Sequence, residues 1–264
     1  MVLTQAGKND PARTEQQFRA ELARKNFGNS LKEIAKNHSI PVMDSECRRF
    51  LRELPPKATL LDIGGSWGWH WRKIRDDAVW PRIILLDFVP ENFSQAKVIL
   101  GPRYRRSVTP LGGDARNLPF GDNSFEAVWT VQTFQHIRDF ARACREAWRV
   151  LKPGGKFINY SLHAPLLLRV LYRIWGKKIH QEGEVSDRFY LRRADQEQKR
   201  IVEQIFQEPV QERFTECLFH PDLRLTFSGS EGSRWGALDA RLAHVPWLGS
   251  LLARQRSFMV VKHT

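Results

Sequence analysis

A short apolar run that ends in a glycine-rich turn is the feature that most constrains how this chain folds. Thr59-Leu60-Leu61-Asp62-Ile63 leads directly into Gly64-Gly65-Ser66-Trp67-Gly68. Because glycine has no Cβ, a turn of this composition lets the backbone approach a ligand closely. A buried strand that enters such a turn is typical of an α/β sheet that binds its ligand at the carboxyl ends of its strands.

Further short strands alternate with helices along the middle of the chain. Strands that are apolar along their whole length are covered by helices on both faces, which indicates an α/β fold with a parallel sheet. A turn is predicted at residues 153–155, Pro-Gly-Gly. In chain order we predict strand 59–63, helix 69–75, strand 82–87, helix 90–100, strand 124–130, helix 140–151 and strand 156–162.

The N-terminal part of the chain has a different texture. Residues 1–55 are polar and lack a clear strand, and amphipathic helices are predicted over 15–25 and 44–54. Asp44 is the predicted N-cap of the second helix, because its side chain can accept from a backbone amide of the first turn. Pro55-Pro56 would end that helix. We therefore divide the chain into an N-terminal helical segment, 1–55, and one domain, 56–264.

Residues 164–264 are expected to supply insertions and to complete the sheet, with a substrate-recognition or lid region at about 164–240. A basic amphipathic helix is predicted over 166–178, because apolar residues are interleaved there with arginines and lysines. Three interpretations of this helix stay open: a surface helix packed on the sheet, a lid over a bound substrate, and a contact with a membrane surface. The spacing of apolar residues also predicts a helix over 190–206 and closing strands over 214–219 and 257–262.

The spacing within the glycine turn argues against two common kinds of nucleotide-binding site. A dinucleotide-binding turn requires G-x-G-x-x-G, and neither Gly64 nor Gly65 starts that spacing. The lysine of a phosphate-binding P-loop is also missing. The pattern resembles motif I of class I methyltransferases instead, which has an acidic residue, one further residue, and then G-x-G-x-G. Ser66 stands where the family has its middle glycine, which costs little if the φ of Ser66 is negative.

Further motifs of the same family follow in order over residues 59–162, and they most resemble the UbiE-like, quinone-biosynthesis branch. The resemblance implies S-adenosyl-L-methionine as cofactor. It also implies a Rossmann-like, seven-stranded, mostly parallel sheet with helices on both faces, N-terminal helices and a helical insertion after strand 5. The motifs are Asp87 at the end of a strand, Gly113-Asp114-Ala115 before Asn117-Leu118-Pro119-Phe120, Ser124-Phe125-Glu126-Ala127-Val128, and Arg149-Val150-Leu151-Lys152-Pro153-Gly154-Gly155.

The resemblance also implies which residues bind the cofactor. In the family, the position of Asp87 binds both ribose hydroxyls, and a carboxylate suits that task because it accepts several hydrogen bonds. The position of Asp114 accepts from the adenine amino group, and Val131 and Gln132 lie where the methionine part is bound. The full predicted set is Asp62, Gly64, Gly65, Ser66, Gly68, Asp87, Phe88, Asp114, Ala115, Val131 and Gln132.

Methyl transfer requires alignment of the acceptor more than it requires acid–base groups. A general base helps only where the acceptor is a hydroxyl or an ammonium group. His163, which follows a predicted strand, and His136 are the candidates for a catalytic base. Each has a plain alternative: His163 as an exposed loop residue, and His136 as a structural hydrogen-bond partner of a neighbouring loop.

Several aromatic residues are candidates for the pocket. Trp67, Trp69 and Trp71 are interpreted as packing residues of the core or of a cofactor lid, with a stacking or cation–π role as the alternative. Candidate walls of the acceptor pocket are Tyr160, Trp175, Phe189 and Tyr190.

The charge of the chain leaves several partners open. Lys and Arg total 42 and Asp and Glu total 29, a formal net charge of +13. Such a balance favours polyanions, anionic lipid or an acidic small substrate. The favoured function is methyl transfer to a small, apolar or anionic molecule. The alternatives are an RNA methyltransferase, motivated by the basic segment 103–106, and a methyltransferase-like binding protein without catalysis. No stable protein partner is implied.

The cysteines and histidines indicate neither disulfides nor metal binding. Cys47, Cys144 and Cys217 are widely spaced, so buried thiols in a reducing cytoplasm are expected. The histidines show no spacing typical of metal ligands, and no metal site is predicted.

Overall fold

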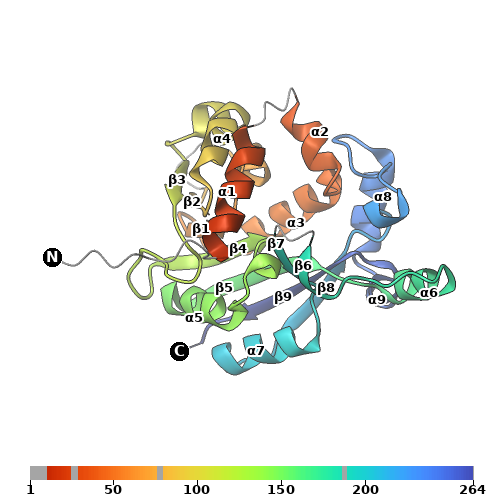
Figure 1. The fold of residues 1–264 in the computed structure, drawn as a ribbon. Coiled ribbons are helices and arrows are strands. Elements are labelled where there is room, and N and C mark those ends of the chain that lie inside the picture. The colour runs from red at the N-terminus through yellow and green to blue at the C-terminus, as the bar shows by residue number, and fades with distance from the viewer. Residues whose placement is uncertain (1–10, 25–28, 76–79, 186–188, 264) are drawn as a thin grey trace.

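A computed structural model describes residues 11–24, 29–75, 80–185 and 189–263. It shows a seven-stranded sheet between two layers of helices (Figure 1). The strand order is β3-β2-β1-β4-β5-β9-β8, and only β9 runs antiparallel to its neighbours. The predicted α/β, mostly parallel sheet is therefore confirmed. The strands are β1 (Thr59–Ile63), β2 (Arg82–Asp87), β3 (Val108–Gly112), β4 (Phe125–Val131), β5 (Leu151–Leu162), β8 (Gln211–Thr215) and β9 (Gln255–Val261).

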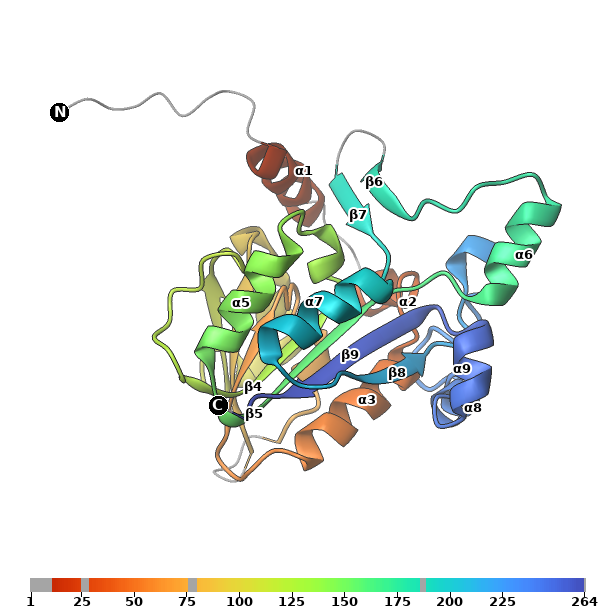
Figure 2. The same cartoon turned by 90° about the horizontal axis from the view of Figure 1, so that it is seen from below.

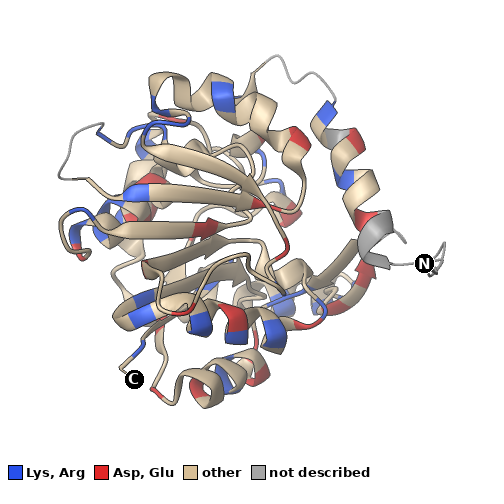
Figure 3. Ribbon diagram, turned by 90° about the vertical axis from the view of Figure 1, so that its left-hand side faces the viewer, with Lys and Arg blue, Asp and Glu red and all other residues tan. Residues whose placement is uncertain are grey.

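Each face of the sheet has its own apolar core. Successive strand residues point to opposite faces, so a strand buried on both sides has no polar face. On β5, Phe157 packs on one face, with its ring 5.2 Å from that of Phe206. Ile158 belongs to the core on the other face, where the ring of Trp129 lies 5.1 Å from that of Phe50. In Figure 3 most of each strand is coloured as neither acidic nor basic.

Helices from different parts of the chain form the two outer layers. The first core is covered by α5 (Phe140–Val150) and α7 (Gln196–Phe206). The second is covered by α3 (Ile40–Arg52), α4 (Phe93–Leu100) and the 3-10 turn η1 (Trp69–Trp71). Cys47, Cys144 and Cys217 are all buried as free thiols, as predicted, and a cytoplasmic location stays a prediction.

The remaining elements lie at the ends of the sheet. Figure 2 shows α6, α8 and α9 gathered at one end of the molecule, beyond β8. These elements are α1 (Pro11–Arg24), α2 (Ser30–Ala35), α6 (Leu166–Ile174), α8 (Arg234–Leu242), α9 (Pro246–Leu252), the hairpin of β6 (Glu182–Val185) and β7 (Phe189–Arg192), and the 3-10 turns η2 (Pro90–Asn92), η3 (Gly101–Arg103), η4 (Phe134–His136) and η5 (Pro221–Leu223).

Some predicted boundaries are wrong for identifiable reasons. Asp44 does not cap a helix: α3 begins at Ile40, with Ser39 at the N-cap and Pro41 in its first turn. The Asp44 carboxylate is buried and instead accepts two hydrogen bonds from the guanidinium of Arg72. Lys25, the predicted end of the first helix, lies outside the described residues.

Three other predicted elements have different extents. The predicted helix over 69–75 is only the 3-10 turn η1, in which Trp69, His70 and Trp71 are all buried, so this segment lacks the exposed face of a surface helix. The start of the predicted helix over 190–206 is strand β7, which pairs with β6. The predicted turn at 153–155 lies within β5, where it makes an irregularity in the pairing with β4.

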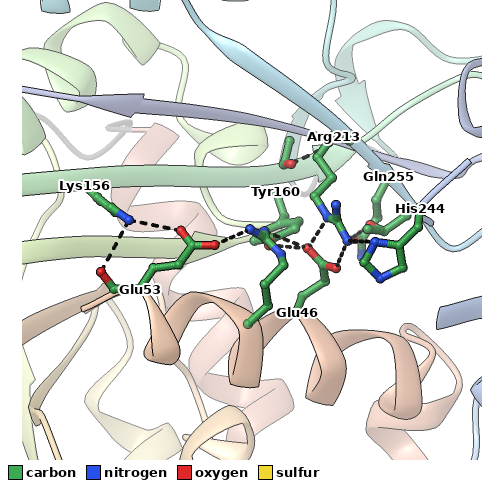
Figure 4. A network of polar contacts seen from close by, with 10 residues as sticks. Glu46, Glu53, Lys156, Tyr160, Arg213, His244 and Gln255 are labelled. Carbon is green, nitrogen blue, oxygen red and sulfur yellow. Dashed lines mark hydrogen bonds and ion pairs between the residues drawn. The ribbon is translucent and has the colours of Figure 1, made fainter. Parts of the chain in front are cut away.

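A buried carboxylate anchors α3 to the far half of the sheet (Figure 4). Glu46 is 2% exposed and accepts two hydrogen bonds of 2.8 Å from Arg213 on β8. The hydroxyl of Tyr160 on β5 donates to it at 2.9 Å, and Arg49 forms an ion pair with it at 3.1 Å. Burial alone would raise the pKa of Glu46, but the two guanidinium groups lower it below its usual value. The network thus joins α3 to β5 and β8.

We predict that Glu46→Gln destabilises the fold by about 3 kcal/mol, because removal of one partner leaves a partly buried charge without compensation. Urea unfolding at pH 7 measures this. Glu53→Gln is the matched control, because Glu53 is a third exposed and pairs with Arg49 and Lys156 near the surface. It should cost less than about 1 kcal/mol.

The stability of the Glu46→Gln variant should also depend less on acidic pH than that of the parent protein. The folded-state pKa of Glu46 is depressed, so its contribution is present above the unfolded-state pKa of about 4.3 and is lost as pH falls. The Gln variant should therefore lose less stability than the parent protein on acidification. Equal losses in both would contradict the assignment.

Candidate functional site

A cavity of about 650 Å³ lies at the carboxyl ends of the central parallel strands. Its walls come from the turns after β1, β2, β3 and β4, and from α1 and α2 of the N-terminal segment. This is the edge where sheets of this topology bind ligands. Among the predicted residues, those that line it are Gly64, Gly65, Ser66, Trp67, Trp69, Asp87, Phe88, Asp114, Ala115, Val131, Gln132 and His136.

The glycine turn packs tightly against its surroundings. A Cβ at Gly64, where φ is +75°, would lie 2.0 Å from Oγ1 of Thr133. A Cβ at Gly65 would lie 2.1 Å from Leu85 and 2.4 Å from the carboxylate of Asp62. A side chain at either position would therefore force neighbouring side chains to move, and at Gly64 it would also strain the backbone. Gly68, at φ +66°, does not line the cavity.

The backbone amides of this turn are engaged with strand β2. Gly64 and Gly65 both donate to the carbonyl of Leu86, at 2.7 and 3.3 Å. Ser66 has a φ of +48°, so the condition of a negative φ is not met. Serine in this left-handed region costs on the order of 1 kcal/mol. The Ser66 amide donates to Asp87 at 2.8 Å, which offsets part of that cost.

Asp87 supports the turn and also lines the cavity. Besides Ser66, the amide of Val89 and the side chain of Asn92 donate to its carboxylate, at 2.8 and 3.2 Å. Burial raises the pKa of Asp87, and these hydrogen bonds partly oppose the rise. A carboxylate has about four acceptor positions, so three donors leave one for a ligand hydroxyl.

Asp62 lies behind the turn, away from the cavity lining. It is 1% exposed, and Nε1 of Trp71 donates to its carboxylate at 2.7 Å. Burial raises the pKa of Asp62 to about 7, with a further contribution from Asp87. Its position indicates that it supports Gly65 and Trp71 from below.

Asp114 and Gln132 lie at other parts of the cavity wall. The carboxylate of Asp114 accepts from the guanidinium and the amide of Arg116, which together hold its pKa below the usual value. Gln132 has a φ of +51°, and its buried Nε2 has no hydrogen-bond partner. A strained residue with an unpaired buried donor is a good candidate for ligand binding.

His136 is held by two hydrogen bonds. Its Nδ1 lies 2.7 Å from the carbonyl of Tyr190, so Nδ1 must carry the proton. The amide of Leu162 donates to Oε1 of Gln135, which leaves the side-chain amide of Gln135 to donate to Nε2 of His136 at 3.2 Å. Burial lowers the pKa of His136 to about 3. This geometry supports the structural alternative for His136.

His163 lies away from the cavity lining. Its amide donates to the carbonyl of Arg254, and its ring packs 5.7 Å from that of Phe214 on β8. Burial lowers its pKa to about 4. His163 therefore does not line this cavity, because it follows β5 and contacts β8 and the residue before β9 instead.

Two histidines that the sequence did not single out line the cavity instead. His38 follows α2, and His70 lies within η1. The ring of Trp69 contacts both, with its centroid 4.0 Å from that of His70 and 5.8 Å from that of His38. The Nδ1 atoms of both histidines are buried and have no hydrogen-bond partner. Burial lowers the pKa of His38 to about 3 and that of His70 well below its usual value.

The remaining predicted residues lie elsewhere. Among the described residues of 164–240 none lines the cavity, and neither does Tyr160, whose hydroxyl is bound to Glu46. Trp175, Phe189 and Tyr190 are therefore not walls of this cavity. The basic segment 103–106 also lies outside the lining. Within the described ranges, no group of three or more His, Cys, Asp or Glu side chains could hold a metal ion.

Residues 61–159 match the family described as a methyltransferase domain. The demethylmenaquinone methyltransferase of Deinococcus radiodurans is 30% identical over 122 residues, which cover 46% of this chain and 50% of that protein. The mitochondrial 2-methoxy-6-polyprenyl-1,4-benzoquinol methylase of Xenopus laevis is 32% identical over 115 residues, 42% of this chain and 35% of that protein. The chain thus spans half or less of the length of these curated relatives.

Solved structures share the fold at low sequence identity. The methyltransferase in complex with the Haloferax volcanii Trm112 methyltransferase activator has a TM-score of 0.59 and 19% identity, over 96% of this chain and 98% of that chain. Phosphoethanolamine N-methyltransferase 2 of Haemonchus contortus, solved with S-adenosyl-L-methionine, has a TM-score of 0.57 and 18% identity, over 84% of this chain and 52% of that chain. These likenesses show that the overall fold is shared with those proteins.

We predict that Asp62→Asn flattens the dependence of stability on pH. An acid whose folded-state pKa is raised to about 7 stabilises the fold below its unfolded-state pKa of about 3.9. That contribution is lost as pH rises toward 7. Asparagine keeps an oxygen for Nε1 of Trp71 but does not titrate, so the variant should lose less stability between pH 5 and pH 8. Urea unfolding at several pH values measures this.

A matched control separates this effect from the general charge of the protein. Asp122 is 70% exposed, and Asp122→Asn should follow the parent protein at every pH. Asp87, whose pKa is also raised, stays in all three proteins and contributes in the same direction. An unchanged pH slope in Asp62→Asn would contradict a raised pKa at that position.

Proposed function

We propose that this chain transfers a methyl group from S-adenosyl-L-methionine to a small molecule. The premise of the proposal is that the chain is a class I methyltransferase, to which the match of residues 61–159 points. The observation that carries this proposal is a set of three buried side-chain nitrogens without a partner, all on residues that line one cavity. They are Nδ1 of His38, Nδ1 of His70 and Nε2 of Gln132. Buried polar atoms of this kind are rare without a bound ligand or water.

The residues that follow β2, β3 and β4 in the cavity wall fit the cofactor. Asp87 retains one acceptor position for a ribose hydroxyl. Asp114, beside Ala115, is suited to accept from an adenine amino group. Gln132 offers an unpaired amide to the methionine part. When bound, S-adenosyl-L-methionine would supply a methyl group on a positively charged sulfur. The sulfur loses its positive charge when the methyl group is transferred.

The side of the cavity at α2 and η1 would take the acceptor. Both imidazoles there are neutral at pH 7, because burial holds their pKa values far below neutrality. A base with so low a pKa is poorly matched to full proton removal. His38 and His70 would therefore orient the acceptor by hydrogen bonds, with Trp69 as a flat surface beside it, and positioning alone can lower a barrier by several kcal/mol.

The acceptor class that fits this description is a ring that carries hydroxyl groups. A flat ring can stack on Trp69, and its hydroxyl can donate to an unpaired imidazole nitrogen. The names of the relatives from Deinococcus radiodurans and Xenopus laevis indicate quinone-type acceptors. A hydroquinone is the acceptor that we propose to test first. The +13 charge by itself does not favour an RNA acceptor, because residues 103–106 lie outside the cavity lining.

We predict that Asp87→Ala weakens the binding of S-adenosylhomocysteine by at least tenfold. A hydrogen bond to a charged acceptor contributes about 1.5–3 kcal/mol, and the variant also releases the amide of Ser66. Isothermal titration calorimetry measures the affinity, and circular dichroism checks that the variant is folded. Asp122→Ala, at an exposed position outside the cavity lining, is the control. Equal affinities for the two variants would place the cofactor elsewhere.

We predict that His38→Ala and His70→Ala each lower kcat/KM for a chemically reduced, short-chain demethylmenaquinone by about tenfold, the value of one hydrogen bond. The affinity for S-adenosylhomocysteine should stay within about twofold. Because neither imidazole titrates near neutrality, the pH profile of kcat should show no histidine ionisation between pH 6 and pH 9. His180→Ala, an exposed residue outside the lining, is the control.

The outcomes separate three functions. Full turnover in both variants would remove the two histidines from the acceptor site. Cofactor binding without transfer to any hydroquinone would favour the binding protein that lacks catalysis. Transfer to RNA, with affinity that falls steeply with salt, would favour the nucleic-acid alternative.

A further inference from the structure

Helix α6 exposes an apolar line of side chains that the cavity does not use. Leu166, Val170 and Ile174 are spaced four residues apart, so they form one line along the helix. Their exposed fractions are 50%, 46% and 72%, and Leu167 lies beside them at 39%. Leu168 is 1% exposed and holds the opposite side of α6 to the protein. Contiguous exposed apolar residues of this size indicate a surface that contacts something else.

Large aromatic residues extend this face. Trp175 follows α6 directly and is 51% exposed. Helix α9 packs beside α6 and exposes Trp247 at 69%. Figures 1 and 2 show both helices at the end of the molecule opposite β3. We call α6, Trp175 and Trp247 the α6 face.

The charged residues of the α6 segment itself have one sign. Arg169 and Arg173 are also four residues apart and form the line next to the apolar one. Lys177 and Lys178 follow, and the sequence from 163 to 181 contains no acidic residue. Within the described part of the chain none of these four cations forms an ion pair, and Nζ of Lys177 lies 5.9 Å from the ring of Trp175.

We propose that the α6 face docks this chain onto the surface of an anionic lipid bilayer. Apolar side chains beside arginines and lysines, with tryptophan at the edge, are the pattern of a helix that lies in the plane of a membrane interface. The apolar line enters the acyl boundary, and the four cations contact lipid phosphates. No described helix is long and apolar enough to cross a membrane. Nine residues of α6 span only about 14 Å, against a hydrocarbon core of about 30 Å.

Other occupants of this face fit less well. A second copy of the chain would place four cations against four cations without an acidic residue between them. A lid over the cavity would need α6 to line it, and none of the described residues of α6 does. An anionic bilayer satisfies both the apolar line and the unpaired charge.

Co-sedimentation of the full chain with lipid vesicles tests this proposal. Vesicles of phosphatidylcholine with 30% phosphatidylglycerol should bind the protein, and pure phosphatidylcholine vesicles should bind it at least tenfold more weakly. Raising the salt concentration should release it. Arg169→Ala/Arg173→Ala should weaken binding to the anionic vesicles about 30-fold, from about 1 kcal/mol for each cation near such a surface.

A second pair of variants tests the apolar line itself. Val170→Glu/Ile174→Glu should abolish binding to the anionic vesicles. Val98→Glu on α4 is the control, because Val98 is 77% exposed and lies outside the α6 face. All variants should keep the circular dichroism spectrum and the S-adenosylhomocysteine affinity of the parent, which distinguishes failure of docking from failure of the cofactor site. No binding of the parent, equal binding of parent and Glu variant, or a dimer that the Glu variant breaks would each overturn the proposal.

Discussion

The carbonyl of Leu86 is where strands β1 and β2 and the cavity meet. It accepts from the amides of both Gly64 and Gly65, while the next residue, Asp87, accepts from Ser66. Ile63 pairs with Leu86 in the sheet, so the register of two buried strands fixes where the turn can sit. A one-residue slip of that register would turn the apolar residues of β2 to the other face. The geometry of the ligand cavity is therefore a consequence of strand pairing.

Segments from distant parts of the chain lie beside the cavity and contact one another. Gln16 on α1 donates to the carbonyl of Phe88, and the guanidinium of Arg19 lies 5.6 Å from the ring of Phe189 on β7. His136 reaches the same hairpin through the carbonyl of Tyr190. The N-terminal segment, the turn after β4 and the β6–β7 hairpin thus contact one another around the cavity. A ligand that orders one of these segments would restrict the others as well.

The sequence predicted the sheet better than it predicted the site. The core strands are short apolar runs, and hydrophobic burial follows local pattern closely. The predicted helix over 69–75 is wrong in length, because Trp69 and Trp71 are both buried in a short turn. The predicted N-cap role of Asp44 is wrong, because its carboxylate pairs with Arg72, which is 28 residues away in the sequence. His38 carried no local signal, since it belongs to a segment whose approach to the cavity depends on tertiary packing.

The histidines also show that local sequence does not indicate which residues near a strand end line the cavity. The residue after a strand is a common position for a ligand-binding group, yet His163 directly follows the part of β5 that pairs with β9, and its amide donates to Arg254. The strand order decides which side of a strand end faces the cavity. Local sequence patterns do not predict the order β4-β5-β9-β8. The assignment of the cofactor residues from motifs stays a prediction; the structure shows that the glycine turn and Asp87 lie at the ends of adjacent strands.

The position of β9 has a consequence for synthesis on the ribosome. It is the last strand of the sheet in chain order, yet it lies inside the sheet, between β5 and β8. Until residues 255–261 emerge, both β5 and β8 have an edge of unpaired amides and carbonyls, one of them beside the apolar Phe157 and Ile158. Such edges pair readily with other chains. The nascent protein therefore passes through a stage in which its central sheet is divided, and chaperones that shield strand edges would act on it at that stage.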